Sequence, residues 1–280
     1  ALVIWWQGKK FINKKYWKYG LAFSLPLIPE ALSIQIMNQS DKIMIQKMVS
    51  FEAAGIFALA TSISFVIWIL EDSVWNAWIP WLYEKIERNE TKDVEKPWTA
   101  VMHMFGIFSW IIVLLAPEEI RILGPKSYQA AVWLVAPMVS GTLFRFYSYS
   151  YSAIQNYHKK TRYVAAGTIG TMFLNVALNY ICILKFGYVA AAYTTAASYL
   201  ILLLVQGILE YKVTGMVIVP LRKTVTIAVV YGAINIATMG LYGMAWYIRY
   251  GLLLFVAAIA FKVMKPQLMA VLHMLKKKKA

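Results

Sequence analysis

The chain has 280 residues, of which 60% are hydrophobic and only 15% are charged, and its formal net charge is +15. A soluble domain is usually about half apolar and about a quarter charged. This composition excludes an ordinary soluble domain and is typical of a polytopic membrane protein. The single cysteine, Cys182, excludes an internal disulfide and a cysteine-based metal site.

Long hydrophobic segments set the predicted topology, because a transmembrane helix needs about 20 mostly apolar residues. Eight segments are near or above this length, so we predict an all-α, polytopic membrane protein with about eight transmembrane helices. The chain begins with "ALVIWW", which is too short to span, and we expect it to end a preceding span of a longer protein. The eight predicted spans lie at 20–42, 53–83, 99–117, 129–154, 163–184, 187–209, 224–243 and 245–264.

Lysine and arginine residues are concentrated in alternate connections between these spans. Of the 28 such residues, 21 fall in one set of connections and tails, and 6 fall in the other set. Cytoplasmic loops carry the excess of Lys and Arg, so we expect both ends of this chain to lie in the cytoplasm. The net charge is therefore explained by topology, and no nucleic-acid partner is predicted. The terminal "KKKK" is expected to bind anionic membrane lipids.

Polar side chains inside the spans are costly in hydrocarbon, so they mark helix contacts or a transport path. On four spans they share one face at helical spacing, which predicts a bundle around a polar cavity. For a single Ser, Thr or Asn, hydrogen bonding between helices is the simpler interpretation. The candidate cavity-lining residues are Glu30, Asn38, Asp41, Glu71, Asp72, Asn76, Arg145, Gln155, Asn175 and Asn179.

Arg145 is the one Lys or Arg that falls in neither set of connections, and it lies inside the predicted span at 129–154. It lies about 5 Å to the cytoplasmic side of the middle of its span, at a rise of about 1.5 Å per residue. Glu71 and Asp72 lie at a similar depth, so one of them is expected to be its anionic partner. The pair is either a permanent structural ion pair or a contact exchanged for an anionic substrate group.

No residue pattern predicts catalysis. The three histidines lack partners at a catalytic spacing, no His, Asp or Glu cluster has metal-ligand spacing, and no glycine-rich phosphate loop is present. The nearest acidic pair, Glu118 and Glu119, is interpreted as the cap of a short outer segment. We therefore predict a protein that is not an enzyme and that needs no cofactor or metal.

The stretch "LPLIPEALSIQIMNQSDKIMIQKMVSFEAAGIFALATSIS" resembles the seventh and eighth spans of bacterial polysaccharide flippases of the MATE-like superfamily of multidrug, oligosaccharidyl-lipid and polysaccharide exporters. Asp41, Lys42 and Ile45 take the place of an Asp-Arg-x-x-Ile-like motif, with Lys in place of the usual Arg. The helix start that follows, "GIFALA", matches the family's small-residue pattern. Further similar segments follow in family order at 78–86, 115–131 and 157–199.

The resemblance implies a two-lobed helical transporter that flips an undecaprenyl-pyrophosphate-linked oligosaccharide across the bacterial plasma membrane by alternating access. Its implied partners are that lipid-linked sugar, membrane lipids, a coupling H⁺ or Na⁺ and a polysaccharide polymerase. A cation-coupled multidrug antiporter of the same superfamily is an alternative, and so is a non-transporting membrane component of envelope synthesis. The family pattern gives no role to Arg145, because an uncharged residue is usual there.

The resemblance also divides the chain. Residues 1–19 would contain the end of a preceding span and a basic loop, 20–211 the C-terminal six-helix lobe, 212–264 two additional helices, and 265–280 a basic tail. Pro26 and Pro29 are expected to interrupt a helix that bends as the lobes rock.

Overall fold

The computed structural model describes residues 14–25, 27–244, 246–258 and 261. In this part of the chain all regular structure is helical, which confirms the all-α prediction. The expected preceding span, the basic tail and Pro26 lie outside the described residues. The main helices are α2 (Lys14–Ser24), α3 (Leu27–Met48), α4 (Phe51–Glu87), α5 (Glu95–Leu123), α6 (Val132–Tyr157), α7 (Thr161–Phe186), α8 (Val189–Thr214), α9 (Leu221–Thr238) and Trp246–Ala258.

Short 3-10 helices join or extend several of these elements. They are η1 (Thr91–Asp93), η2 (Lys126–Ala131) and η3 (Met239–Leu241). Counted with these extensions, six helical segments of the described chain are long and apolar enough to cross a membrane. They are Phe51–Glu87, Thr91–Leu123, Lys126–Tyr157, Thr161–Phe186, Val189–Thr214 and Leu221–Leu241. The chain is thus an all-α polytopic membrane protein.

The first and last predicted spans differ from the structure. Instead of one helix at 20–42, α2 ends at Ser24 and a separate helix, α3, runs from Leu27 to Met48. Pro29 fits in the first turn of α3, where its missing N–H has no helical partner to lose. At 245–264 the described helix is Trp246–Ala258, which is shorter than the six spanning segments. Of the eight predicted spans, these two therefore do not meet the length and composition of a membrane span within the described residues.

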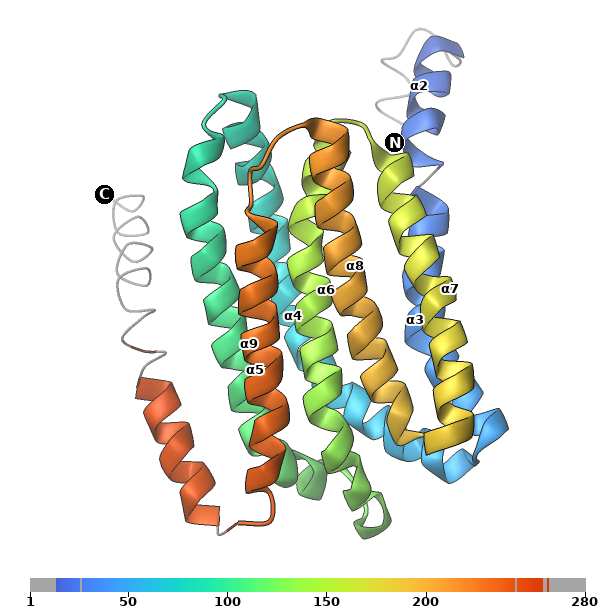
Figure 1. Ribbon diagram of the computed structural model, residues 1–280, viewed down its shortest axis with the longest axis vertical. Coiled ribbons are helices and arrows are strands. Elements are labelled where there is room, and N and C mark those ends of the chain that lie inside the picture. Colours follow the sequence, from blue (N-terminus) through green and yellow to red (C-terminus); the bar gives the residue numbers. More distant parts are fainter. Residues whose placement is uncertain (1–13, 26, 245, 259–260, 262–280) are drawn as a thin grey trace, which may run out of the picture.

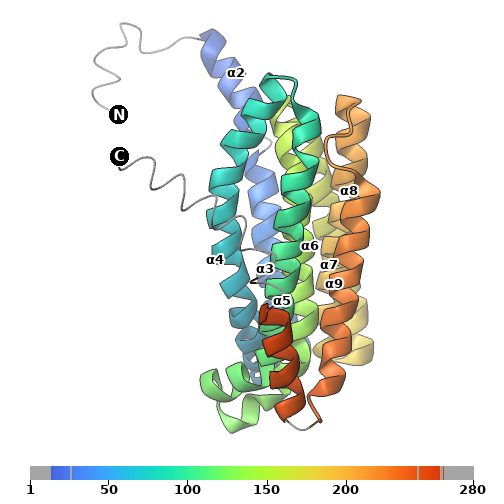
Figure 2. The same ribbon diagram turned by 90° about the vertical axis from the view of Figure 1, so that its left-hand side faces the viewer.

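Successive helices run up and down the bundle (Figures 1 and 2). The connections α4–α5, α6–α7 and α8–α9 lie together at one end, and the connections α3–α4, α5–α6 and α7–α8 lie at the other (Figure 1). We call the first the basic end, because its connections and flanking turns contain many Lys and Arg residues. These are Lys85, Arg88, Lys92, Lys96, Lys159, Lys160, Arg162, Lys212, Arg222 and Lys223. The alternation that the sequence predicts therefore agrees with the arrangement of the helices.

Helix α6 is the centre of the bundle. In its most apolar window 78% of the residues are buried, against 33–50% in the other five spanning segments. It packs against α4, α5, α7, α8 and α9. It lies close to α8 at Gly141, where an added Cβ would lie 3.1 Å from the Cα of Ala196. Small residues allow such close backbone contact between membrane helices.

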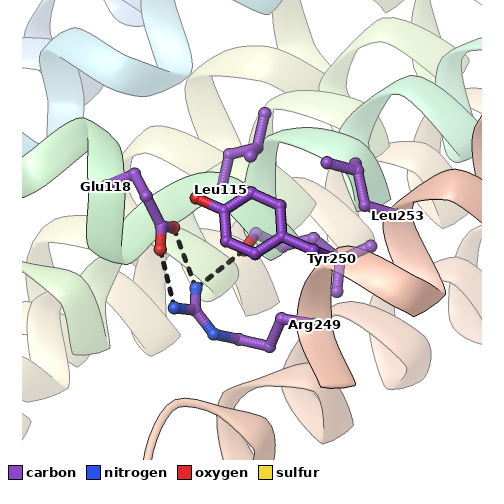
Figure 3. Close-up of a pocket in the computed structure, with 6 residues that line it drawn as sticks. Leu115, Glu118, Arg249, Tyr250 and Leu253 are labelled. Carbon is purple, nitrogen blue, oxygen red and sulfur yellow. Dashed lines mark hydrogen bonds and ion pairs between the residues drawn. The ribbon is translucent and has the colours of Figure 1, made fainter. Parts of the chain in front are cut away.

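An ion pair fastens the helix Trp246–Ala258 to α5 (Figure 3). Arg249 donates from Nη1 to Glu118 Oε2 at 2.8 Å and from Nη2 to Glu118 Oε1 at 2.7 Å. Nη1 also donates to the carbonyl oxygen of Leu114 at 3.2 Å. The interpretation of Glu118 and Glu119 as the cap of a separate outer segment is wrong, because α5 continues through both residues to Leu123.

Candidate functional site

Arg145 and Glu71 form a buried ion pair between α6 and α4. The Nη2 atom of Arg145 donates to Glu71 Oε2 at 3.2 Å, and the two side chains are only 7% and 1% exposed. The sequence left two acidic partners open, and the structure selects Glu71. A charge in a membrane span usually pairs with another charge or lines a pathway. In this structure Arg145 pairs with the charge of Glu71.

Three aromatic rings surround the guanidinium of Arg145. Its Cζ lies 5.9 Å from the ring centre of Trp68, 5.8 Å from Tyr149 and 5.9 Å from Tyr199. These distances fit cation–π attraction, which strengthens when the cation is shielded from water. The pair has unused hydrogen-bonding atoms, because Arg145 Nε and Glu71 Oε1 have no hydrogen-bond partner in the described part of the chain. The guanidinium therefore keeps hydrogen-bonding capacity for a second anionic group.

Asp41 lies at the centre of a second buried polar group, between α3, α7 and α8. Its side chain accepts a hydrogen bond from Asn179 Nδ2 at 2.5 Å and another from Thr195 Oγ1 at 2.7 Å. Asp41 is only 3% exposed, and among the described residues it forms no ion pair. Taking a carboxylate out of water costs several kcal/mol unless its charge is compensated. A proton or a small cation bound to Asp41 would lower this cost.

The residues around Asp41 extend the network. Asn175 donates from Nδ2 to Thr195 Oγ1 at 3.1 Å and to Ser198 Oγ at 3.3 Å. Thr194 donates to Asn179 Oδ1. All of these groups are neutral, and several present oxygen atoms, which are the preferred ligands of hard cations. We call Asp41, Asn175, Asn179, Thr194, Thr195 and Ser198 the Asp41 network.

A cavity of about 190 Å³ lies between α3, α4 and α6, at the same side of α6 as the Arg145–Glu71 pair. Glu30 is the predicted site residue that lines it. The other lining residues include three aromatic side chains and two small polar ones. The full lining is Glu30, Ile34, Trp75, Ile79, Tyr83, Tyr149, Ser152, Ala153 and Asn156.

Part of the chain matches a family of known proteins. Residues 1–86 match the family of polysaccharide biosynthesis proteins. The match supports the predicted resemblance to a polysaccharide biosynthesis and flippase family, and it covers less than half of the chain. No curated protein and no solved structure gives a significant match.

The polysaccharide biosynthesis match reaches from the start of the chain to the last turn of α4. It thus includes Glu30, Asp41 and Glu71, and it stops before Arg145 and the Asn residues of α7. The match suggests a role in polysaccharide synthesis or export. The match does not specify the substrate or the mode of action.

The remaining predicted residues lie apart from these clusters or at their edge. Asp72 and Asn76 are exposed on α4, and Asn76 Nδ2 donates to Asp72 Oδ2 at 3.3 Å. Gln155 is buried and donates to Gln206 Oε1 at 2.9 Å, so it joins α6 to α8. Asn38 accepts a hydrogen bond from Tyr199. The ten residues are therefore divided between two buried clusters, one cavity, one exposed pair and two contacts between helices.

Sequence reasoning missed the contribution of α8. Thr194, Ser198 and Gln206 lie at multiples of four residues along this helix, and all three are buried in contact with α6 or α7. Their spacing puts them on one helix face. That spacing is the signal that could have found them.

Proposed function

We propose that the protein flips an undecaprenyl-pyrophosphate-linked oligosaccharide across the bacterial plasma membrane by alternating access, without catalysing a chemical reaction. The family match supports a role in polysaccharide synthesis or export. The observation that carries the proposal is the buried Arg145, held between Glu71 and three aromatic rings with Nε unpaired. The flipped lipid would then be available to a polysaccharide polymerase on the outer face.

In this proposal Arg145 exchanges Glu71 for the pyrophosphate of the substrate. A guanidinium suits the exchange because its planar set of N–H donors can hold a carboxylate or a phosphate with two parallel hydrogen bonds. The exchange leaves Glu71 buried without a partner, which is unfavourable. Glu71 therefore competes with the substrate for Arg145 and promotes its release after the lobes have rocked.

The Asp41 network supplies the site for a coupling ion in the same proposal. Asp41 is buried among neutral side chains, and a bound H⁺ or Na⁺ would neutralise it. Gain or loss of the ion would change the charge between α3, α7 and α8, and a transporter needs such a change to drive its conformational cycle. Proton or sodium coupling is thus assigned to Asp41.

A cation-coupled multidrug antiporter is the second candidate. It is favoured by the Asp41 network, which needs a cation but no anionic substrate, and by the aromatic rings of Trp68 and Tyr149. The guanidinium of Arg145 among those rings repels a cationic drug. The flippase is therefore the better supported candidate.

Complementation tests the proposal. A strain that lacks its polysaccharide flippase receives the full-length gene, and surface polysaccharide and accumulated lipid-linked oligosaccharide are measured. We expect Arg145→Lys to give a folded protein with little surface polysaccharide, because an ammonium group lacks the planar donor set. Asp72 is the exposed neighbour of Glu71, and we expect Asp72→Asn to restore wild-type amounts of surface polysaccharide.

The charge swap Glu71→Arg with Arg145→Glu separates the two roles of the pair. It should restore folding, measured as the amount of protein in the membrane, but not surface polysaccharide. If the swap restores both, the ion pair is purely structural and Arg145 does not bind the substrate. Resistance to cationic drugs without any surface polysaccharide would favour the antiporter.

A further inference from the structure

We propose that the cavity between α3, α4 and α6 is a saccharide subsite, which binds one sugar ring of the lipid-linked substrate. The inference rests on the proposed function and extends it, because it assigns the sugar to residues that are separate from Arg145. Four features support it: the size of the cavity, its lining, an unpaired acceptor and its position relative to the ion pair.

The cavity has the size of a single sugar. Its volume is about 190 Å³. A space of this order admits one sugar ring and is too small for a whole oligosaccharide.

The lining combines aromatic faces with hydrogen-bonding groups. A pyranose ring has apolar C–H faces and a rim of hydroxyl groups, so it needs both kinds of contact. Trp75, Tyr83 and Tyr149 provide aromatic surface, and the Trp75 and Tyr149 ring centres are 5.6 Å apart. Glu30 and Asn156 provide acceptors and an amide donor for the hydroxyls.

One of these acceptors is unpaired. The Oδ1 atom of Asn156 is buried and has no hydrogen-bond partner among the residues that the structure describes. Buried polar atoms are normally hydrogen-bonded, so an unpaired oxygen on a residue that lines the cavity can accept a hydrogen bond from a donor outside the chain. A sugar hydroxyl is such a donor.

The cavity continues directly from the ion pair toward the basic end. On α4, Glu71 is followed at four-residue intervals by Trp75, Ile79 and Tyr83, and the last three line the cavity. On α6, Arg145 is followed by Tyr149, which also lines it and whose ring lies 5.8 Å from Arg145 Cζ. The two helices run in the same direction (Figure 1), so one four-residue step moves about 6 Å from the pair to the first cavity residues.

This order matches the covalent order of the substrate. In an isoprenyl-pyrophosphate-linked sugar, the first sugar is bonded directly to the pyrophosphate, on the side opposite the isoprenyl chain. With the pyrophosphate on Arg145, that sugar reaches Trp75 and Tyr149 without a spacer. The remaining sugars would point toward the basic end, where the substrate is loaded in the proposed function.

Binding to the purified full-length protein tests the subsite. The probes are farnesyl pyrophosphate, which has no sugar, and a panel of farnesyl pyrophosphates that carry glucose, galactose or N-acetylglucosamine. We expect at least one sugar-bearing probe to bind about ten-fold more tightly than farnesyl pyrophosphate. Trp75→Leu and Asn156→Ala should remove this preference and leave the affinity for farnesyl pyrophosphate unchanged.

Trp81→Leu is the matched control, because Trp81 lies on the same helix and does not line the cavity. It should keep the sugar preference. Equal affinities of all probes in the wild-type protein, or an equal loss for both kinds of probe in Trp75→Leu, would overturn the subsite. Failure of the proposed function gives a different result: farnesyl pyrophosphate then binds Arg145→Ala as tightly as the wild-type protein.

Discussion

The hydroxyl group of Tyr199 donates a hydrogen bond to Asn38 Oδ1 at 2.9 Å, and so it joins α8 to α3. The ring of the same tyrosine lies 5.9 Å from Cζ of Arg145. Asn38 precedes Asp41 by three residues, close to one turn of α3. Tyr199 therefore contacts the Arg145–Glu71 pair directly and reaches the Asp41 network through Asn38.

Tyr199→Phe tests whether this contact couples the two clusters. The variant keeps the ring beside Arg145 and loses the hydrogen bond, which should cost about 1 kcal/mol of stability. In the wild-type protein we expect Na⁺ or pH to change the affinity for farnesyl pyrophosphate, and in Tyr199→Phe we expect this dependence to weaken. Tyr211→Phe, an exposed position on α8, is the control. An unchanged dependence in Tyr199→Phe would show that the contact does not couple the sites.

Glu71 and Asp72 are neighbours, but replacing them should change the stability of the protein by very different amounts. Glu71→Gln leaves the guanidinium of Arg145 buried without a charged partner, and breaking a buried pair in this way costs about 3–5 kcal/mol. Asp72 is exposed, so Asp72→Asn should change stability by at most about 0.5 kcal/mol. Thermal unfolding in detergent measures both. Equal stability of the two variants would contradict the assignment of Glu71 as the partner of Arg145.

Asp41→Asn tests the ion site. A ligand that binds only the folded protein raises its stability, by about 2.7 kcal/mol at a concentration 100 times its Kd. Replacing choline chloride by sodium chloride should therefore raise the unfolding temperature of the wild-type protein and leave that of Asp41→Asn unchanged. If the site binds a proton, the unfolding temperatures of the two proteins should instead differ in their dependence on pH, and sodium should have no effect. If sodium and pH change the unfolding temperatures of both proteins equally, Asp41 is not the ion site.

The sequence predicted six of the spanning helices and limited the partner of Arg145 to two residues, for physical reasons. Apolar runs of about 20 residues have few alternatives in a membrane. A buried arginine needs an anion, and Glu71 and Asp72 were the acidic residues at a matching depth. The sequence could not choose between them. Glu71 points into the bundle and Asp72 points out of it, and the rotation of α4 against α6 decides which of the two does so.

The sites themselves could be predicted only in part. Asp41 was found because a carboxylate in a span is conspicuous, whereas Thr194 and Tyr199 were missed because hydroxyl residues are common in membrane helices. The partner of Glu118 was missed for a different reason. Arg249 lies 131 residues away in the chain, and only the packing of the last described helix brings the two side chains together.

Orientation in the membrane is the fourth prediction. The basic end should lie in the cytoplasm, because Lys and Arg in short loops are retained there. Reporter tags inserted after Arg88, Lys160 and Val217 should be cytoplasmic, and tags after Lys126 and Lys185 should be outside. Protease protection or enzyme-fusion activity measures each tag. A reversed tag at any of the first three positions would contradict the orientation.

The last prediction concerns the close contact of α6 with α8. At Gly141 an added Cβ would lie 3.1 Å from Cα of Ala196, and a backbone atom cannot move aside as the end of a side chain can. Gly141→Val should therefore separate the two helices and cost about 1–3 kcal/mol of stability. Because α8 carries Thr194 and Thr195, the shift should also weaken ion binding at Asp41. Gly170→Val is the matched control, since nothing lies within 4 Å of a Cβ at that position in α7. Its stability and its sodium response should be close to those of the wild-type protein. Equal effects of the two valines would show that α6 and α8 do not need this contact.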